Sequence, residues 1–282
     1  MVEMIFHTAH GTLRLQGWRE DTMRHAAELG TQIVRDSRRL GEFVQFEDAP
    51  AYVKASPFRG ASRVRHALRR TLLARRVPRI NEYFNLSWLI ERHFQAALPL
   101  AAGVFLRRGV PHYQFIITRE VPESETLLEF LDGSSAAERA PVLDEIAREV
   151  ARMHSLGFLH HDLYPRNLLV CGPDRPRRVV FLDAWAGGPP TNLRGPGYDL
   201  ACFFLDGADL ITRAEQAEFL RTYFDQREAQ GRPANPERLL AKVAAARRTL
   251  HKQLVRDPAR LRGRALPSRE WSGKLALANG AP

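Results

Sequence analysis

Alternation of apolar and polar residues predicts strands in the first third of the chain. Residues 31–36 (TQIVRD) and 42–48 (EFVQFED) flank a polar turn as a hairpin, and residues 51–56 (AYVKAS) alternate as a third strand. A further hairpin is predicted over residues 103–118, where two apolar runs flank RRGVP. We expect these segments to form one antiparallel sheet.

Helical spacing of apolar residues predicts most of the remaining elements. Residues 60–76 (GASRVRHALRRTLLARR) form a basic helix, and Pro78 fits the first turn of the next one. At residues 119–124 the chain becomes acidic and helical, and we place a lobe boundary there. Further helices are predicted over residues 140–157, 198–204, 211–228 and 235–255, with two short strands between the first two of them.

Polar residues interrupt an apolar run in FLHHDLYPRNLLV, residues 158–170. His160, Asp162 and Asn167 have the spacing H-x-D-x-x-x-x-N, between a helix that ends at Gly157 and a strand that begins at Leu168. This is the catalytic-loop signature of kinases. Phosphoryl transfer needs a carboxylate to orient the acceptor hydroxyl and an amide oxygen to hold a metal ion. We therefore expect Asp162 to be catalytic and Asn167 to bind the metal.

Two residues of the N-terminal half extend the resemblance to kinases. Lys54, on the third predicted strand, matches the lysine that contacts the α- and β-phosphates of ATP in kinase-like proteins. Glu82, on the helix that follows, matches the ion-pair partner of that lysine. Glu91 on the same helix is an alternative partner.

Three residues of the second half fit the same pattern. Asp183 in FLDAW resembles the magnesium-binding aspartate of D-F-G, although Ala and Trp replace Phe and Gly. Asp199 in GYDLACFF resembles the buried aspartate that supports the catalytic loop. His160 is expected to support the loop by hydrogen bonding, and we assign no proton transfer to His160 or His161.

Within the kinase-like proteins, the chain resembles the bacterial lipopolysaccharide kinases, which phosphorylate Kdo or heptose of the inner core. The resemblance covers roughly residues 50–205 and rests on the stretches YVKASPFRG, NEYFNLSWL, ALPLAAGVFLRRG, HHDLYPRNLLV, FLDAW and YDLA. It implies ATP and Mg²⁺ as cofactors, bound between two lobes, and a sugar or glycolipid as the acceptor.

The implied fold class is α+β, a bilobal protein-kinase-like fold with a small β-rich lobe and a larger, mainly helical lobe. Residues 1–121 would form the ATP-binding lobe, residues 122–256 the lobe with the catalytic loop, and residues 257–282 a flexible tail.

Other features of the sequence limit the kinase interpretation. No G-x-G-x-x-G lies between the first two predicted strands, where Gly41 is the glycine present. Asp199 follows Asp183 by 16 positions without an A-P-E sequence, which leaves no room for the peptide-docking segment of a protein kinase. The alternatives are a small-molecule kinase of the aminoglycoside or choline phosphotransferase type and a pseudokinase that acts as a binding module.

The net charge of +10 favours anionic partners. Arginines concentrate in residues 59–79, which form either a solvated helix face or a surface for an anionic membrane; no nucleic acid is expected, because exposed aromatic residues are not interleaved with them. Cys171 and Cys202 lie in apolar segments and are interpreted as buried thiols. Without a membrane span or leader sequence, the protein is expected to be cytoplasmic, with peripheral binding to the inner membrane possible.

Overall fold

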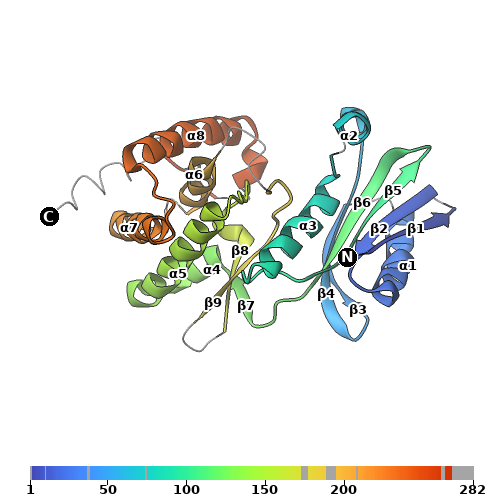
Figure 1. The fold of residues 1–282 in the computed structure, drawn as a ribbon, viewed down its shortest axis with the longest axis horizontal. Coiled ribbons are helices and arrows are strands. Elements are labelled where there is room, and N and C mark those ends of the chain that lie inside the picture. Colours follow the sequence, from blue (N-terminus) through green and yellow to red (C-terminus); the bar gives the residue numbers. More distant parts are fainter. Residues whose placement is uncertain are drawn as a thin grey trace. The chain divides into compact units, whose positions relative to one another are not determined.

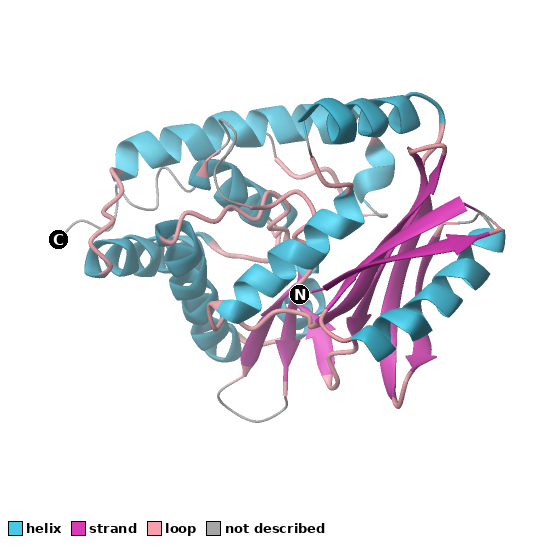
Figure 2. Cartoon of the chain, turned by 45° about the vertical axis from the view of Figure 1, so that its right-hand side comes forward, coloured by secondary structure: helices cyan, strands magenta, loops and turns pink. Residues whose placement is uncertain are grey.

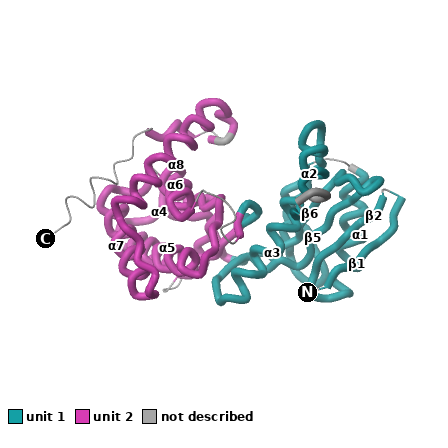
Figure 3. The backbone as a smooth tube through the Cα atoms, turned by 45° about the horizontal axis from the view of Figure 1, so that its top comes forward, with its two compact units in different colours: residues 1–122, 183–186 teal, residues 123–182, 187–282 magenta. Residues whose placement is uncertain are grey.

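The computed structural model describes residues 2–9, 11–36, 39–73, 75–172, 177–188, 195–207, 209–261 and 264–268. The chain divides into two compact units, residues 1–122 with 183–186 and residues 123–182 with 187–282 (Figure 3). Across the described ranges, no helix combines the length and the apolar character that crossing a membrane requires.

The described residues of the first unit contain a six-stranded antiparallel sheet with the strand order β1-β2-β5-β6-β4-β3 (Figure 1). The strands are β1 (Val2–Thr8), β2 (Gly11–Gly17), β3 (Leu40–Phe46), β4 (Ala49–Pro57), β5 (Pro99–Arg107) and β6 (Val110–Arg119). Along β4, Ala51, Val53 and Ala55 belong to the hydrophobic core. Successive side chains of a strand point to opposite faces, so Lys54 lies on the other face of the sheet.

Two helices cover the two faces of this sheet (Figure 2). Helix α1 (Glu20–Asp36) contributes Met23, Ala26 and Ile33 to the core with Phe115. Helix α3 (Pro78–Glu91) packs against β5 and β6 and contacts Lys54, so it covers the other face. Helix α2 (Gly60–Leu73) lies between β4 and α3 in the chain and contacts β6.

The predicted strand over residues 31–36 is wrong, because these residues form the last turns of α1. The apolar face of the helix starts upstream of this segment, with Met23, Ala26 and Ile33 buried at helical spacing. A short window that begins at residue 31 shows only the end of that pattern. The strands β1 and β2 precede α1, so Lys54 lies on the fourth strand of the chain and not on the third.

Five helices and a small sheet make up the described part of the second unit. The sheet has the order β7 (Ser124–Thr126), β8 (Leu168–Cys171) and β9 (Arg178–Phe181). The helices are α4 (Leu127–Gly133), α5 (Ala136–Ser155), α6 (Pro196–Asp206), α7 (Arg213–Ala229) and α8 (Pro236–Arg256). Helix α5 packs on α7 and α6 packs on α8. The helices predicted from residue 140 onward are confirmed, and both cysteines are free and buried, as predicted.

The predicted tail, residues 257–282, is described only in part. Pro258–Leu261 forms a 3₁₀ turn. Arg264 donates a hydrogen bond to the carbonyl of Asp206 at 2.6 Å, and Arg247 donates one to the carbonyl of Ser268 at 2.9 Å. Residues 269–282 lie outside the described residues.

We expect Gly103→Ala on β5 to lower the free energy of unfolding by about 1–3 kcal/mol, as overpacked cores do. The new Cβ would lie 2.6 Å from Cδ2 of Leu15 and equally close to the ring of Phe115, which also lies close to Gly30 of α1. Urea denaturation measures the change.

Gly133→Ala is the matched control for this substitution. Its Cβ would meet no atom within 4 Å, so stability should be unchanged or slightly higher. Equal stability of the Gly103 variant and the wild type would show that the core around Phe115 adapts without cost.

Candidate functional site

Lys54 and Glu82 form an ion pair in the first unit. The pleat of β4 points Lys54 away from the main core, and its Nζ lies 3.2 Å from Oε1 of Glu82 on α3. Glu82 is 1% exposed. Glu91, the alternative partner, is exposed and pairs with its neighbour Arg92 at 3.9 Å. The geometry therefore favours Glu82 over Glu91 as the partner of Lys54.

Asp183 and Arg79 complete a cluster of four charged groups. Oδ1 of Asp183 lies 3.1 Å from Nζ of Lys54 and 3.3 Å from Nη1 of Arg79. The same guanidinium nitrogen also contacts Oε2 of Glu82. The four-charge cluster, as we call Lys54, Arg79, Glu82 and Asp183, thus contains two cations and two carboxylates. Each carboxylate contacts both cations.

The charges in this cluster depend on one another. Burial alone would lower the pKa of Lys54, but Glu82 and Asp183 outweigh that effect and raise the pKa, so the ammonium group stays charged. Burial is also the largest influence on Glu82 and raises its pKa, while Lys54 and Arg79 act in the opposite direction. The pKa of Glu82 stays above its ordinary value, and the two cations offset part of the cost of burying this carboxylate.

Helix α3 also binds the backbone that follows Asp183. Asn85 donates a hydrogen bond to the carbonyl of Ala184 at 2.6 Å, and Asn81 donates one to the carbonyl of Trp185 at 2.8 Å. Asp183 itself has φ of 55°, a conformation uncommon for a residue with a side chain. These contacts attach residues 183–185 to the first unit.

Sequence reasoning missed three of the residues on this face of α3. Arg79 and Glu82 are three positions apart, and Asn81 and Asn85 are four apart, so each pair lies on one side of the helix. Such spacing of polar residues within an otherwise apolar helix was the available signal. From this helix, the sequence pattern assigned only a glutamate, Glu82 or Glu91, to the site.

In the second unit, a buried aspartate organises the predicted catalytic loop. Asp199 is fully buried on α6, and its two oxygens accept hydrogen bonds from the backbone N–H groups of His160 and His161, each at 2.7 Å. His154 of α5 contacts the same carboxylate at 3.1 Å. Burial would raise the pKa of Asp199, but the hydrogen bond and charge of His154 and the neighbouring histidines outweigh it, and the pKa is lowered.

His160 and Asn167 connect this loop to Leu182. Nε2 of His160 lies 2.9 Å from the carbonyl oxygen of Leu182, and the carbonyl of Asn167 accepts a hydrogen bond from the N–H of Leu182 at 2.9 Å. Leu182 directly precedes Asp183 in the chain. The loop therefore fixes Leu182, the residue directly before the metal-binding candidate Asp183.

Asp162 lies within the same bonded loop and is partly buried. Its carbonyl accepts hydrogen bonds from the Asn167 side chain and from the N–H of Tyr164, both at 2.8 Å. Because the nitrogen of the Asn167 amide is used within the loop, the amide oxygen is the atom suited to a metal ion.

Asp183 in the first unit and Asn167 in the second each carry a donor atom of the kind that a magnesium ion binds. Mg²⁺ prefers oxygen ligands and is usually held by one or two protein groups plus phosphates and water. Asp183 offers a carboxylate and Asn167 an amide oxygen, and the described residues contain no cluster of three or more His, Cys, Asp or Glu side chains that would hold a metal alone. Oδ1 of Asp183 already attracts two cationic groups, whose summed charge equals that of one Mg²⁺.

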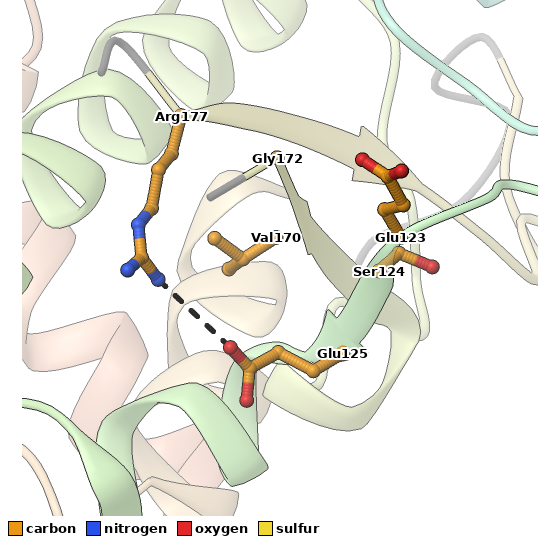
Figure 4. Close-up of a pocket in the computed structure, with 6 residues that line it drawn as sticks. All are labelled: Glu123, Ser124, Glu125, Val170, Gly172 and Arg177. Atoms are coloured by element: carbon orange, nitrogen blue, oxygen red, sulfur yellow. Dashed lines mark ion pairs between the residues drawn. The ribbon is translucent and has the colours of Figure 1, made fainter. Parts of the chain in front are cut away.

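A pocket elsewhere in the second unit contains none of these residues (Figure 4). It has a volume of about 530 Å³ and is lined by Glu123, Ser124, Glu125, Val170, Gly172 and Arg177. Arg177 points toward Glu125, with 3.9 Å between the charged atoms. We assign this open pocket no function.

Comparison with known proteins identifies similar families and folds. The model of the lipopolysaccharide kinase (Kdo/WaaP) family matches residues 25–185. The KEOPS complex subunit Bud32 of Pyrococcus abyssi (strain GE5 / Orsay) is 31% identical over 85 residues, which is 30% of this chain and 37% of that protein. The match thus spans little more than a third of this curated relative.

Solved structures show the fold. WaaP in complex with acyl carrier protein has a TM-score of 0.56 and 20% sequence identity, and the match covers 84% of this chain and 99% of that chain. A microcompartment-associated aminopropanol kinase has a TM-score of 0.46 and 17% identity, covering 86% of each chain. The similarity to WaaP confirms the predicted protein-kinase-like α+β fold.

We expect Asp199→Asn to lower the free energy of unfolding by about 3 kcal/mol at neutral pH, because an amide group then faces a buried N–H donor. The lowered pKa of Asp199 means that its contribution is present above the unfolded pKa, about 3.9, and is lost as pH falls through the folded value. The difference between wild type and variant should therefore shrink below about pH 4. Urea denaturation across pH 3–7 measures it.

Asp132→Asn, at an exposed position of α4, is the control and should change stability little. A loss of stability in the Asp199 variant no greater than in this control would contradict the supporting function of Asp199.

Proposed function

Because this chain belongs to the lipopolysaccharide kinase (Kdo/WaaP) family, we propose that it transfers the γ-phosphoryl group of ATP to a hydroxyl of a lipopolysaccharide core sugar, Kdo or heptose. The observation that supports this proposal most is the four-charge cluster. Phosphoryl transfer needs a cation at the phosphates and a carboxylate for the metal ion. Lys54 and Asp183 supply both groups, with 3.1 Å between Nζ and Oδ1.

The first unit would act on the nucleotide. Lys54 would donate hydrogen bonds to the α- and β-phosphates, with its ammonium group oriented by the buried Glu82. Asp183 and Asn167 would hold Mg²⁺, which when bound neutralises charge on the phosphate oxygens. The charged state of Lys54, which its two carboxylate neighbours stabilise, suits an anionic ligand.

The catalytic loop of the second unit would act on the acceptor. Asp162 would accept a hydrogen bond from the attacking hydroxyl and so orient it. The loop is suited to this task because its backbone is bound on both sides of Asp162, by Asp199 at His160 and His161 and by the Asn167 side chain. A group fixed in advance loses little freedom when the reaction begins.

The proposed acceptor is a sugar and not a peptide. The 16 positions from Asp183 to Asp199 leave no room for a long peptide-docking segment. Family membership favours a sugar of the lipopolysaccharide core over an aminoglycoside or choline-like acceptor.

We expect Asp162→Asn to reduce turnover by about 10²- to 10⁴-fold, the usual contribution of a general acid or base. Folding and ATP affinity should remain close to those of the wild type, because the hydrogen bonds that Asn167 and Tyr164 donate to Asp162 use its backbone carbonyl, which the substitution keeps. Transfer from labelled ATP to core oligosaccharide, followed by mass spectrometry of the product, measures turnover and identifies the phosphorylated sugar.

Thermal unfolding and nucleotide titration of the Asp162 variant are the controls for this experiment. Turnover equal to that of the wild type would remove Asp162 from the mechanism. Phosphorylation of aminoglycoside or choline in place of the oligosaccharide would support the small-molecule alternative, and a wild type that binds no Mg²⁺–ATP would be a pseudokinase.

We further propose that helix α2 brings the protein to an anionic membrane surface, where a glycolipid acceptor is embedded. Val64 and Leu68 are 59% and 53% exposed, and the exposed Arg65 and Arg69 lie beside them at the same spacing of four residues. Apolar and arginine side chains on one exposed helix face are typical of helices that bind the membrane interface. Helix α2 also contacts β6 of the sheet, and its His66 packs on Phe58, which follows β4.

We expect the double variant Arg65→Gln/Arg69→Gln to bind anionic vesicles on the order of 30-fold more weakly, at roughly 1 kcal/mol per arginine. Co-sedimentation with phosphatidylglycerol vesicles measures binding. Wild-type binding should decrease as salt rises from 0.1 M to 1 M, where the Debye length falls from about 10 Å to about 3 Å.

Arg248→Gln/Lys252→Gln on α8 is the matched control, because it removes two exposed positive charges that are also four residues apart. Equal weakening by both double variants would show a general charge effect. If the wild type does not bind anionic vesicles at low salt, this function of α2 is excluded.

A further inference from the structure

Arg79 contacts the carboxylate of Asp183, which the proposed mechanism assigns to the metal ion. We propose that Arg79 competes with Mg²⁺ for Oδ1 of Asp183 and thereby sets the metal concentration that nucleotide binding requires. This inference rests on the proposed function. It makes Arg79 a positioning residue of the nucleotide site.

The competition follows from the geometry at a single oxygen atom. Nη1 of Arg79 lies 3.3 Å from Oδ1 of Asp183, and Nζ of Lys54 lies 3.1 Å from the same atom. A bound Mg²⁺ would lie about 2.0–2.1 Å from a carboxylate oxygen and requires near-octahedral ligands around it. Two cationic groups at this oxygen occupy that space and repel the ion, so at least one must withdraw when the metal binds.

Each cation has a second partner, but the two partners differ. Lys54 would move to the phosphates of the nucleotide. Arg79 keeps Glu82, whose Oε2 already contacts the same guanidinium nitrogen. Glu82 is 1% exposed, whereas the side chain of Asp183 is 25% exposed, so Asp183 is the carboxylate that a ligand from solvent can reach. Arg79 can therefore leave Asp183 without losing all its charge compensation.

The backbone near Arg79 restricts the movement to its side chain. The N–H of Arg79 donates a hydrogen bond to Oε1 of Gln114 at 3.1 Å, and Gln114 donates one in turn to Ser56 at 3.3 Å. Both partners lie on the sheet, in β6 and β4. Within the described part of the chain, Nε of Arg79 is buried without a hydrogen-bond partner. The guanidinium group is thus incompletely bonded on a fixed backbone, and a shift away from Asp183 breaks the 3.3 Å contact while the contact with Glu82 can remain.

A different arrangement would make Arg79 a direct ligand of the phosphates. The unbonded Nε is compatible with that arrangement, but both oxygens that Nη1 contacts belong to carboxylates of the cluster. The two possibilities predict opposite effects of removing the positive charge. If Arg79 is a phosphate ligand, removing its charge should weaken nucleotide binding with or without metal. If Arg79 is a competitor, removing its charge should strengthen binding of the metal and leave metal-free nucleotide binding unchanged.

We expect Arg79→Gln to lower the Mg²⁺ concentration for half-maximal thermal stabilisation, at a fixed saturating concentration of ADP, by roughly three- to tenfold. The typical net contribution of one hydrogen bond corresponds to about that factor, and the contact of Arg79 with Asp183 is long, at 3.3 Å, and partly exposed. The affinity for metal-free ADP, measured by calorimetry, should change less than about twofold. Arg79→Lys keeps the charge and should need nearly as much Mg²⁺ as the wild type. This variant also tests the proposal if the glutamine variant folds poorly.

Arg92→Gln is the matched control, since it removes one positive charge at the other end of α3, where Arg92 pairs with Glu91 and stacks on Trp88. Its Mg²⁺ requirement should equal that of the wild type. An unchanged or higher requirement in Arg79→Gln overturns the competition, and weaker binding of metal-free ADP in that variant would instead make Arg79 a phosphate ligand. A wild type that binds no Mg²⁺–ADP at all would contradict the proposed kinase function itself.

Discussion

A carboxylate that is almost fully buried needs positive charge beside it, and Glu82 imposes this requirement on the first unit. It is met by two cations from different elements, Lys54 on β4 and Arg79 on α3. Both cations also contact Oδ1 of Asp183. This explains why residues 183–186 belong to the first compact unit although the chain on either side of them belongs to the second.

The second unit also contains a buried carboxylate, and its partners include backbone N–H groups. Asp199 is fully buried and stays ionised because two backbone N–H groups and His154 bond to it. The bonds fix His160 and His161 and allow His161 its φ of 59°. Tyr223 of α7 bonds the other side of the His154 ring at 2.9 Å. Asp199 on α6 thus bonds the loop that contains Asp162, and His154 of α5, which Tyr223 of α7 contacts, bonds Asp199 in turn.

The sequence predicted the parts of this structure that depend on local pattern. The alternation around Lys54, the spacing of His160, Asp162 and Asn167, and the helices from residue 140 onward all follow from short-range regularity. The strand predicted at residues 31–36 failed because its apolar residues belong to a longer helical period. The polar spacing on α3 marks Arg79, Asn81 and Asn85 as a bonded face, but their partners in residues 183–185 lie about a hundred positions away, and local spacing does not identify a partner at that distance.

The spacing of those contacts on α3 limits how this chain can change in length. An α-helix turns by about 100° per residue, so one residue inserted between Arg79 and Asn85 would rotate the asparagine contacts away from those of Arg79. The turn at Arg108 and Gly109 differs from α3, because it joins the neighbouring strands β5 and β6 and a Cβ added at Gly109 would meet no atom within 4 Å. Natural variants of this chain should therefore accept insertions at this hairpin while the seven residues from 79 to 85 keep their number.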